Sequence, residues 1–255
     1  MVAGSSSPPQ QRAAALLNSY RRNFAKAVCC ADPSWTCTVL GVGDARYAAW
    51  RTTLEQAGEG TRDTYSQAIA RAAGVTRPSL DMLLEPALRK PTPGSVVAAR
   101  IPNLALLDVL PHELGLAILR MRALSLRSAE VRLLIDKQTR SQISAWTGVH
   151  PDIFMQDSHS IGIADAGWLK TAIRMPPLVS HDALTLSIEG WILLLRDIGA
   201  DPPSDTITLR RLALPRSLVV PRWLVELPAR FDAFGSEQLF ERLPRLLPEY
   251  AWVFG

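Results

Sequence analysis

The 255-residue sequence predicts a mainly α fold: a multi-helix globular body around a central buried helix, with short proline-broken segments at the C-terminus. Three observations predict this class. Apolar residues recur at helical spacing in one segment after another, without a regular alternation of strands and helices. Leucines within residues 104–135 fall on two faces of one predicted helix, as expected of an element that packs on two sides. Seven prolines between Pro202 and Pro248 interrupt the last third of the chain.

Composition agrees with a folded protein that has no membrane-spanning segment. Hydrophobic residues make up 47% and charged residues 20% of the sequence, close to the averages of globular domains. The longest apolar runs are far shorter than the roughly 20 residues needed to cross a bilayer, and the small, polar residues 1–12 do not resemble a signal peptide. We therefore expect a flexible tail over 1–12, a helical domain over 13–255, and a soluble, cytoplasmic protein.

The first predicted helix, 13–28, is amphipathic, and two more follow at 45–57 and 61–73. Each of the latter two is followed by a glycine, Gly58 or Gly74, which is typical of a helix C-terminus.

Prolines mark two interruptions in this half of the chain. Asp32 and Pro33 are predicted to begin a new helix, as an N-cap and a first helical residue. Five prolines within residues 75–102 predict a linker or an irregular excursion. This stretch is a candidate boundary between an N-terminal helical subdomain and the remainder.

The main predicted helix covers residues 104–135, with Pro111 tolerated in a first turn. Asp136 is predicted to cap a shorter helix at 137–147, which Gly148 ends.

Two later helices are predicted at 164–174 and 182–198, the second capped by Ser180 or Asp182. Residues 206–214 fit a strand or a helix equally well.

Arginines interrupt the main helix, and their placement decides what kind of helix it is. One apolar face contains Leu114, Ala117, Ile118, Met121, Leu124, Val131 and Ile135, and a second contains Leu119, Leu126 and Leu133. A membrane-surface helix would have one thoroughly basic half, and a DNA-reading helix a contiguous polar face, and this helix has neither. We expect arginine stems to lie along apolar surface with their guanidinium groups at its edge. The alternative is that Arg120, Arg122 and Arg127 meet acidic residues of a partner protein.

Motifs for catalysis or for cofactor and metal binding do not emerge, so no such residues are predicted. His150 and His159, near Asp152 and Asp157, lack the spacing of a helical metal-ligand pair, and the two aspartates are expected in turns or caps. Two further motifs are set aside on geometric grounds. Residues 180–182, Ser-His-Asp, are consecutive and cannot form a catalytic triad with one another, and the glycines of residues 41–46 fit a turn rather than a dinucleotide fingerprint.

Cys29, Cys30 and Cys37 are odd in number and clustered, without a C-x-x-C pattern. We expect them to be free or buried thiols of a reducing compartment.

Residues 110–148, LPHELGLAILRMRALSLRSAEVRLLIDKQTRSQISAWTG, carry a family resemblance. The matching features are a Leu-Pro opening, Arg-x-Arg-Ala-Leu at 120–124, Ala-Glu-Val-Arg at 129–132, an Ile-Asp break and a closing Trp-x-Gly; an opening helix followed by CADPSW at 30–35 also fits. The segment resembles the K-type subunits of bacterial type III secretion systems, the SctK family, particularly its plant-pathogen Hrp branch.

The resemblance implies a cytoplasmic scaffold of the sorting platform, peripheral to the inner-membrane base of the secretion apparatus. Such a subunit would join the pod-forming Q-type protein, with its ATPase-associated L-type protein, to the cytosolic domain of the inner-membrane ring D-type protein. It implies no cofactor and transfers no catalytic or binding residue.

Two other classes remain as hypotheses. The net charge of +4 is compatible with a basic helical nucleic-acid-binding or regulatory protein, whose affinity would fall steeply with salt. A helical enzyme would need a pocket with convergent titratable residues.

Overall fold

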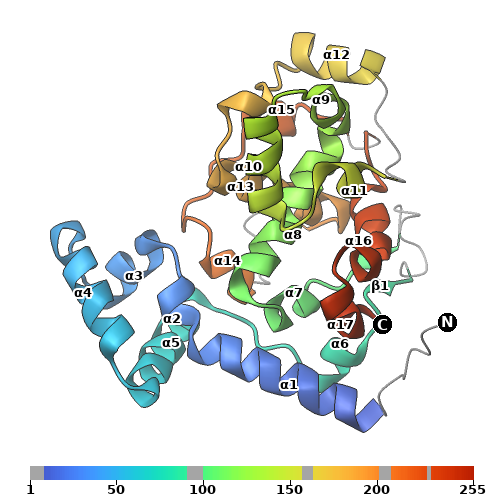
Figure 1. Ribbon diagram of the computed structural model, residues 1–255. Helices are drawn as coiled ribbons and strands as arrows, with labels where there is room; N and C mark the ends of the chain where they lie inside the picture. The colour runs from blue at the N-terminus through green and yellow to red at the C-terminus, as the bar shows by residue number, and fades with distance from the viewer. Residues whose placement is uncertain (1–8, 91–99, 157–162, 201–207, 229–230) are drawn as a thin grey trace.

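The computed structural model describes residues 9–90, 100–156, 163–200, 208–228 and 231–255, and within them the chain is mainly α, as predicted (Figure 1). The first half contains α1 (Pro9–Ala25), α2 (Ala27–Cys30), α3 (Pro33–Leu40), α4 (Asp44–Gln56), α5 (Glu59–Ala73), α6 (Leu80–Leu84), β1 (Leu88–Arg89), β2 (Ile101–Pro102), α7 (Ala105–Val109) and α8 (His112–Leu126). The second half contains α9 (Ser128–Leu133), α10 (Lys137–Thr147), α11 (Pro151–Met155), α12 (Ile163–Thr171), the 3₁₀ turn η1 (Leu178–Ser180), α13 (Ala183–Asp197), α14 (Leu209–Leu212), α15 (Arg222–Val225), α16 (Gly235–Leu246), η2 (Pro248–Tyr250) and α17 (Ala251–Phe254). Strands β1 and β2 form a two-stranded antiparallel ribbon.

Helices α8 and α13 form the centre of the molecule and pack against each other more extensively than any other pair. Their backbones approach closely at Gly190, where a Cβ atom would lie 1.8 Å from the carbonyl oxygen of Leu119. Only glycine fits at such a contact. The central buried helix expected from the leucine pattern is therefore α8, paired with α13.

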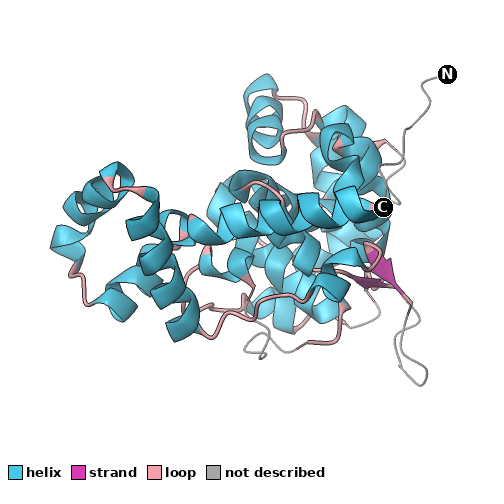
Figure 2. Ribbon diagram, turned by 90° about the horizontal axis from the view of Figure 1, so that it is seen from below, coloured by secondary structure: helices cyan, strands magenta, loops and turns pink. Residues whose placement is uncertain are grey.

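The N-terminal helices form a lobe beside this centre. Figures 1 and 2 both show α3, α4 and α5 projecting to one side, with α1 running along the body. Ser66 on α5 connects the lobe to α1 and α2: its hydroxyl oxygen accepts a hydrogen bond from the backbone N–H of Val28 and donates to the carbonyl of Ala25, both at 3.0 Å. These bonds satisfy backbone groups at the α1–α2 junction, where the helical ladder is interrupted.

The C-terminal third returns to the N-terminal helices. The indole N–H of Trp35 donates to the carbonyl of Leu214 at 2.9 Å, and the backbone N–H of Asp32 donates to the carbonyl of Leu212 at 2.7 Å. Residues 209–212 are helical, which decides between the two alternatives for 206–214 within the described part of that segment. Prolines flank the short helices α14 and α15, as predicted, but α16 continues through Pro244.

Most predicted helix ends are confirmed. The side chains of Asp32, Asp136 and Asp182 accept hydrogen bonds from the first turns of α3, α10 and α13. Gly74 and Gly148 end their helices in the left-handed conformation, with φ of 72° and 71°.

Several boundaries differ from the prediction. The helix predicted over 13–28 begins earlier, at Pro9, and ends as α1 at Ala25, and α2 (Ala27–Cys30) follows Lys26. Gly58 does not end α4, because Ala57 is the C-cap and Gly58 precedes the first residue of α5. The predicted helix 164–174 ends as α12 at Thr171.

The single helix predicted over residues 104–135 is wrong, because the chain forms α7, α8 and α9 there. Pro111 stands at the N-cap of α8, so the first interruption follows the proline rule. The second, at Arg127, has no proline or glycine. As a result, Leu133 and Ile135, predicted on the apolar faces, are 66% and 94% exposed.

Candidate functional site

Arg122 lies inside the protein and binds acidic residues of its own chain. Its guanidinium donates to the carboxylate of Asp197 on α13 through Nη2 at 2.7 Å and Nε at 3.1 Å, and to Asp232 through Nη1 at 2.7 Å. Nε also donates to the hydroxyl of Ser236 at 2.8 Å. Burial by itself lowers the pKa of Arg122, but Asp197 and Asp232 outweigh it and raise the pKa overall. The buried cation is therefore held in its charged form.

Asp232 reaches Arg122 from an uncommon backbone conformation. Its φ is 56°, in the left-handed region that aspartate tolerates better than most residues. The next element, α16, begins at Gly235, where a Cβ atom would lie 2.6 Å from Nη2 of Arg122. Residues 232–236 are thus shaped around this guanidinium.

Arg127 forms a second buried network at the junction of α8 and α9. Its Nη2 donates to both carboxylate oxygens of Glu189 at 3.0 Å, and Nη1 donates to the carbonyl of Pro176 at 2.7 Å. Oε1 of Glu130 lies 3.4 Å from Nη1 of Arg127, and Oε2 of Glu130 accepts a hydrogen bond from the backbone N–H of Leu178 at 3.0 Å. Arg122 on α8 and Arg127 at the C-terminal end of α8 therefore pair with two carboxylates of α13, Asp197 and Glu189. These pairs fix the two helices in register.

The guanidinium groups were expected at the edge of the apolar surface. This is wrong for Arg122 and Arg127, whose side chains are 0% exposed. The packing of the helix on two sides is confirmed, but the guanidinium groups are interior because the same chain supplies carboxylates to pair them. Arg120 is closer to the expectation: it is partly buried, and it donates to the hydroxyl of Ser187 at 3.0 Å and the carbonyl of Trp146 at 3.1 Å. The hypothesis that these three arginines meet a partner's acidic residues is likewise wrong for Arg122 and Arg127.

A third buried network joins α7, α8 and α14. The carboxylate of Asp108 accepts the backbone N–H groups of Leu209 and Arg210, both at 3.0 Å. Arg210 donates through Nε to the carbonyl of Leu107 at 2.7 Å. Burial raises the pKa of Asp108 to about 6, and burial together with the charge of Arg210 lowers the pKa of His112 to about 4. The pKa of the Asp108 carboxyl group is therefore higher than the pKa of the His112 imidazole, which reverses their usual order.

The residues set aside as chemical motifs have structural roles. Asp182 caps α13, and the hydroxyl of Ser180 donates to the carbonyl of Pro177 at 2.8 Å, so the Ser-His-Asp sequence is no triad. His150 is the N-cap of α11, with Asp152 in the first turn; Asp157 and His159 lie outside the described residues.

The glycines of residues 41–46 have the predicted role. Gly41 and Gly43 form the turn between α3 and α4, and the three cysteines are free thiols. Within the described ranges, no group of three or more His, Cys, Asp or Glu side chains is placed to hold a metal ion.

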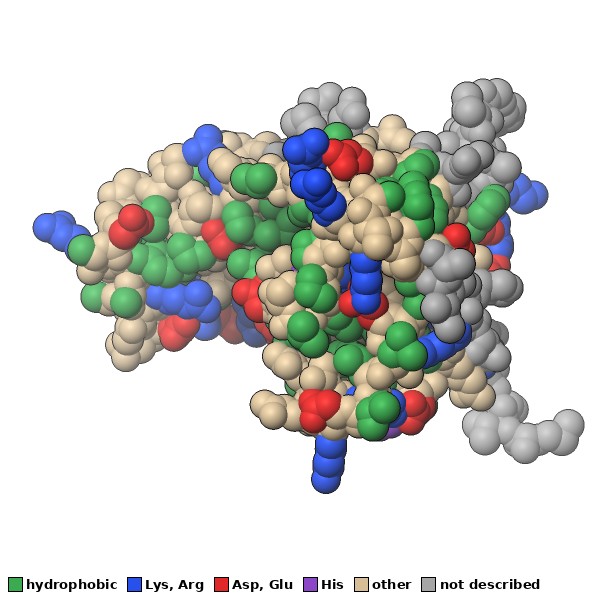
Figure 3. Space-filling view, turned by 90° about the horizontal axis from the view of Figure 1, so that it is seen from above, with side chains coloured by type: hydrophobic (Ala, Val, Ile, Leu, Met, Phe, Trp, Pro, Cys, Tyr) green, Lys and Arg blue, Asp and Glu red, His purple; other side chains and the backbone are tan. Residues whose placement is uncertain are grey.

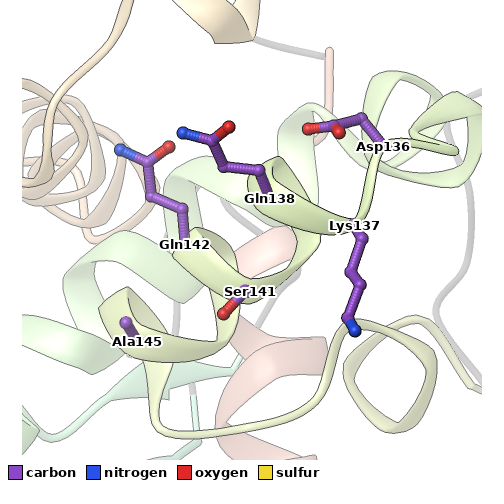
Figure 4. A pocket seen from close by; sticks show the side chains of 6 residues that line it. All are labelled: Asp136, Lys137, Gln138, Ser141, Gln142 and Ala145. Carbon is purple, nitrogen blue, oxygen red and sulfur yellow. The ribbon is translucent and has the colours of Figure 1, made fainter.

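Among the residues that the structure describes, two hollows are candidate binding features. One is a cavity of about 290 Å³ between α6, the ribbon, α7 and the end of α13, lined by Met82, Arg89, Asp108, Leu195 and Thr208 among others. The other is a shallow depression over the outer face of α10 (Figure 4). Asp136 and Lys137 are among the residues that line it. Figure 3, which views the molecule from above Figure 1, shows hydrophobic side chains at the surface among those of Lys, Arg, Asp and Glu.

The carboxylates that pair with the buried arginines, Glu189, Asp197 and Asp232, were not predicted from the sequence. Glu189 and Asp197 lie in SIEGWILLLRD, an apolar helix with two acidic residues, and α8 is an apolar helix with arginines. Opposite charges on two apolar helices are the available signal for buried ion pairs, because each would be too costly to bury alone. Asp232 carries no such signal, since its position depends on the loop before α16.

These features define a class of protein: a helical protein in which buried ion pairs hold the helices in place. The comparison with known families identifies the member. The family model described as bacterial type III secretion protein (HrpB4) matches residues 7–249. The chain belongs to this family, which confirms the resemblance to a type III secretion accessory subunit of the Hrp branch.

No curated protein and no solved structure matches the chain. In the described part of the chain, no helix combines the length and apolar character required to cross a membrane.

Proposed function

We propose that the chain is a non-catalytic scaffold of the type III secretion apparatus. In this proposal it links the pod-forming Q-type protein, with its ATPase-associated L-type protein, to the cytosolic domain of the inner-membrane ring D-type protein. Its place would be the cytoplasm, peripheral to the inner-membrane base. Family membership over residues 7–249 supports a role in this apparatus.

The observation that carries the scaffold role is the internal pairing of Arg122 and Arg127. Their charges are directed at Asp197, Asp232 and Glu189 of the same chain, between the two central helices. Groups used in this way hold a shape and do not face a substrate. A folded helical body with exposed apolar side chains, such as Leu133, Ile135 and Val219, is suited to protein contacts.

The nucleic-acid hypothesis rests on the net charge of +4. Phosphate binding requires cations on an accessible surface. The arginines of residues 120–127 do not add to such a surface, because they are buried or partly buried.

Co-purification tests the proposal. The tagged full-length chain is co-expressed separately with the Q-type protein and with the cytosolic domain of the D-type protein. We expect each to be retained with the chain through size-exclusion chromatography. A Leu126→Asp variant, which should not fold, is the negative control. Retention of neither protein by the folded wild-type chain would refute the proposed function.

A further inference from the structure

Helix α1 carries cations on its exposed side and no carboxylate. The helix and the residue that follows it contain four cations, Arg12, Arg21, Arg22 and Lys26, and neither aspartate nor glutamate. Arg12 donates to two backbone carbonyls of α17, both at 3.1 Å. The other three side chains are exposed, and among the described residues they take part in no hydrogen bond or ion pair. These three define what we call the α1 cation face.

The opposite side of α1 is fixed in the core, where Leu16, Tyr20 and Phe24 are buried. Arg22 and Lys26 are one helical turn apart, so they stand on the same side of the chain. Figure 2 shows α1 running across the front of the molecule in the view from below. A partner would meet cations on a helix whose position is already set, which reduces the entropy lost on association.

Carboxylates on the neighbouring helices do not neutralise the α1 cation face. Helices α5, α6 and α7 pack against α1 and carry four of them: Glu59, Asp63, Asp81 and Asp108. None of these four forms an ion pair with the face. Asp108 is buried and accepts two backbone N–H groups of α14, and Arg62 and Arg71 offset the two acidic residues of α5.

The end of the face at Lys26 is not neutralised either. Glu55 lies on the same side of the lobe, since it and Lys26 both act on the thiol of Cys29, but it is already paired with Arg51 at 3.1 Å. Asp81 is thus the one acidic residue of these helices left against three cations. The remaining positive charge complements an acidic surface.

A lipid surface matches the α1 cation face less well than a protein does. A membrane-surface helix buries its apolar side among lipids, whereas the apolar side of α1 faces the core. Electrostatic binding to anionic lipids without insertion uses clusters of roughly 4–8 cations. Three cations on one helix fall short of such a cluster, but they are enough to meet a few carboxylates of a protein.

We propose that the α1 cation face binds an acidic segment of a secretion-apparatus protein, with carboxylates spaced to meet Arg22 and Lys26 at the same time. This inference rests on the proposed scaffold function and names the chemistry of one partner. The guanidinium groups of Arg21 and Arg22 would each hold a carboxylate through paired hydrogen bonds. Lys26 would act as a compact point charge.

The test removes the three charges with Arg21→Gln/Arg22→Gln/Lys26→Gln. The matched control, Arg46→Gln/Lys137→Gln/Arg216→Gln, removes three exposed cations of other elements, so both variants have the same net charge. Calorimetry measures the dissociation constants of the full-length chain for the purified Q-type protein and for the D-type cytosolic domain. We expect the α1 variant to bind one of these proteins at least tenfold more weakly, and the control to change that affinity less than threefold.

Two further measurements separate charge from folding. Circular dichroism and thermal unfolding establish that both variants are folded. The charge-retaining variant Arg21→Lys/Arg22→Lys/Lys26→Arg should bind more tightly than the glutamine variant. Between about 50 and 200 mM salt, the wild type should lose more affinity than the glutamine variant, because screening weakens contacts between exposed charges.

Every other outcome overturns the inference in a recognisable way. Binding that survives the α1 substitutions, or that falls equally in the control, would overturn it while leaving the scaffold function standing. A wild-type dimer in analytical ultracentrifugation that the α1 variant dissociates would overturn it in favour of a second copy. Loss of binding to phosphatidylglycerol vesicles, with unchanged protein binding, would overturn it in favour of a membrane. If the wild-type chain binds neither protein, the scaffold function fails and the inference fails with it.

Discussion

The guanidinium of Arg122 and the carboxylate of Asp197 lie 2.7 Å apart with side chains 0% and 3% exposed, and they join the two central helices of the protein. Removing one partner of a buried pair leaves an uncompensated charge. We therefore expect Arg122→Met or Asp197→Leu alone to lower the free energy of unfolding by about 3–5 kcal/mol. Urea denaturation measures the loss.

The double variant Arg122→Met/Asp197→Leu should be more stable than the sum of the two single losses predicts, because neither member of the pair is left behind as a lone buried charge. Asp232 keeps the double variant below the wild type, since it also loses its partner. Strictly additive losses would show that the two side chains do not interact.

The close approach of α8 and α13 predicts intolerance at Gly190. A Cβ atom there would meet backbone atoms of Leu119, which cannot move aside as a flexible side chain can. Gly190→Ala should lower the free energy of unfolding by at least about 3 kcal/mol. Gly167→Ala on α12 is the matched control: nothing lies within 4 Å of its added methyl group, so it should be neutral or stabilising by up to about 1 kcal/mol. Equal effects at the two glycines would contradict the packing.

Leu126 and Leu133 occupy equivalent positions in the heptad pattern but different environments. Leu126 is 1% exposed and Leu133 is 66% exposed. Leu126→Asp should abolish the cooperative thermal transition, because it buries a carboxylate without a partner. Leu133→Asp should leave the midpoint within a few degrees of the wild type. A normal transition for Leu126→Asp would place that face in solvent.

Asp108 and His112 predict opposite pH dependences that offset each other. The folded-state pKa of Asp108, about 6, exceeds the usual 3.8, so its contribution to stability falls as pH rises from about 4 to 6. The folded-state pKa of His112, about 4, is below the usual 6.5, so its contribution rises with pH over nearly the same window. Each effect amounts to roughly 3 kcal/mol.

Single variants separate the two contributions. Relative to wild type, Asp108→Asn should gain stability as pH rises from 4 to 6.5, and His112→Gln should lose it. Urea denaturation at several pH values provides the comparison. A slope unchanged by either substitution would show that the pair does not titrate in this way.

The sequence was sufficient to predict the helices whose ends are encoded locally. Asp32, Asp136, Asp182, Gly74 and Gly148 act within one turn of their own residues, so the predicted caps hold. The family likeness was visible for a related reason, because most of its features lie within one continuous segment of residues 110–148.

The break between α8 and α9 at Arg127 could not be predicted from such local signals. The leucine repeat continues across it, and no proline or glycine marks it. The chain turns where the guanidinium of Arg127 meets Glu189 on α13 and the carbonyl of Pro176, residues far away in the sequence. For the same reason the exposure of Leu133 and Ile135 was not anticipated: both residues continue the apolar pattern of α8, and only the break exposes them.

The central claim is that the chain connects two components of the secretion apparatus, and a bridging measurement tests it most directly. The D-type cytosolic domain is immobilised, and capture of the purified Q-type protein is recorded with and without the full-length chain. The account predicts that the Q-type protein is captured only when the chain is present, in a stoichiometric ternary complex. Capture that is equal without the chain, or absent with it, would contradict the account.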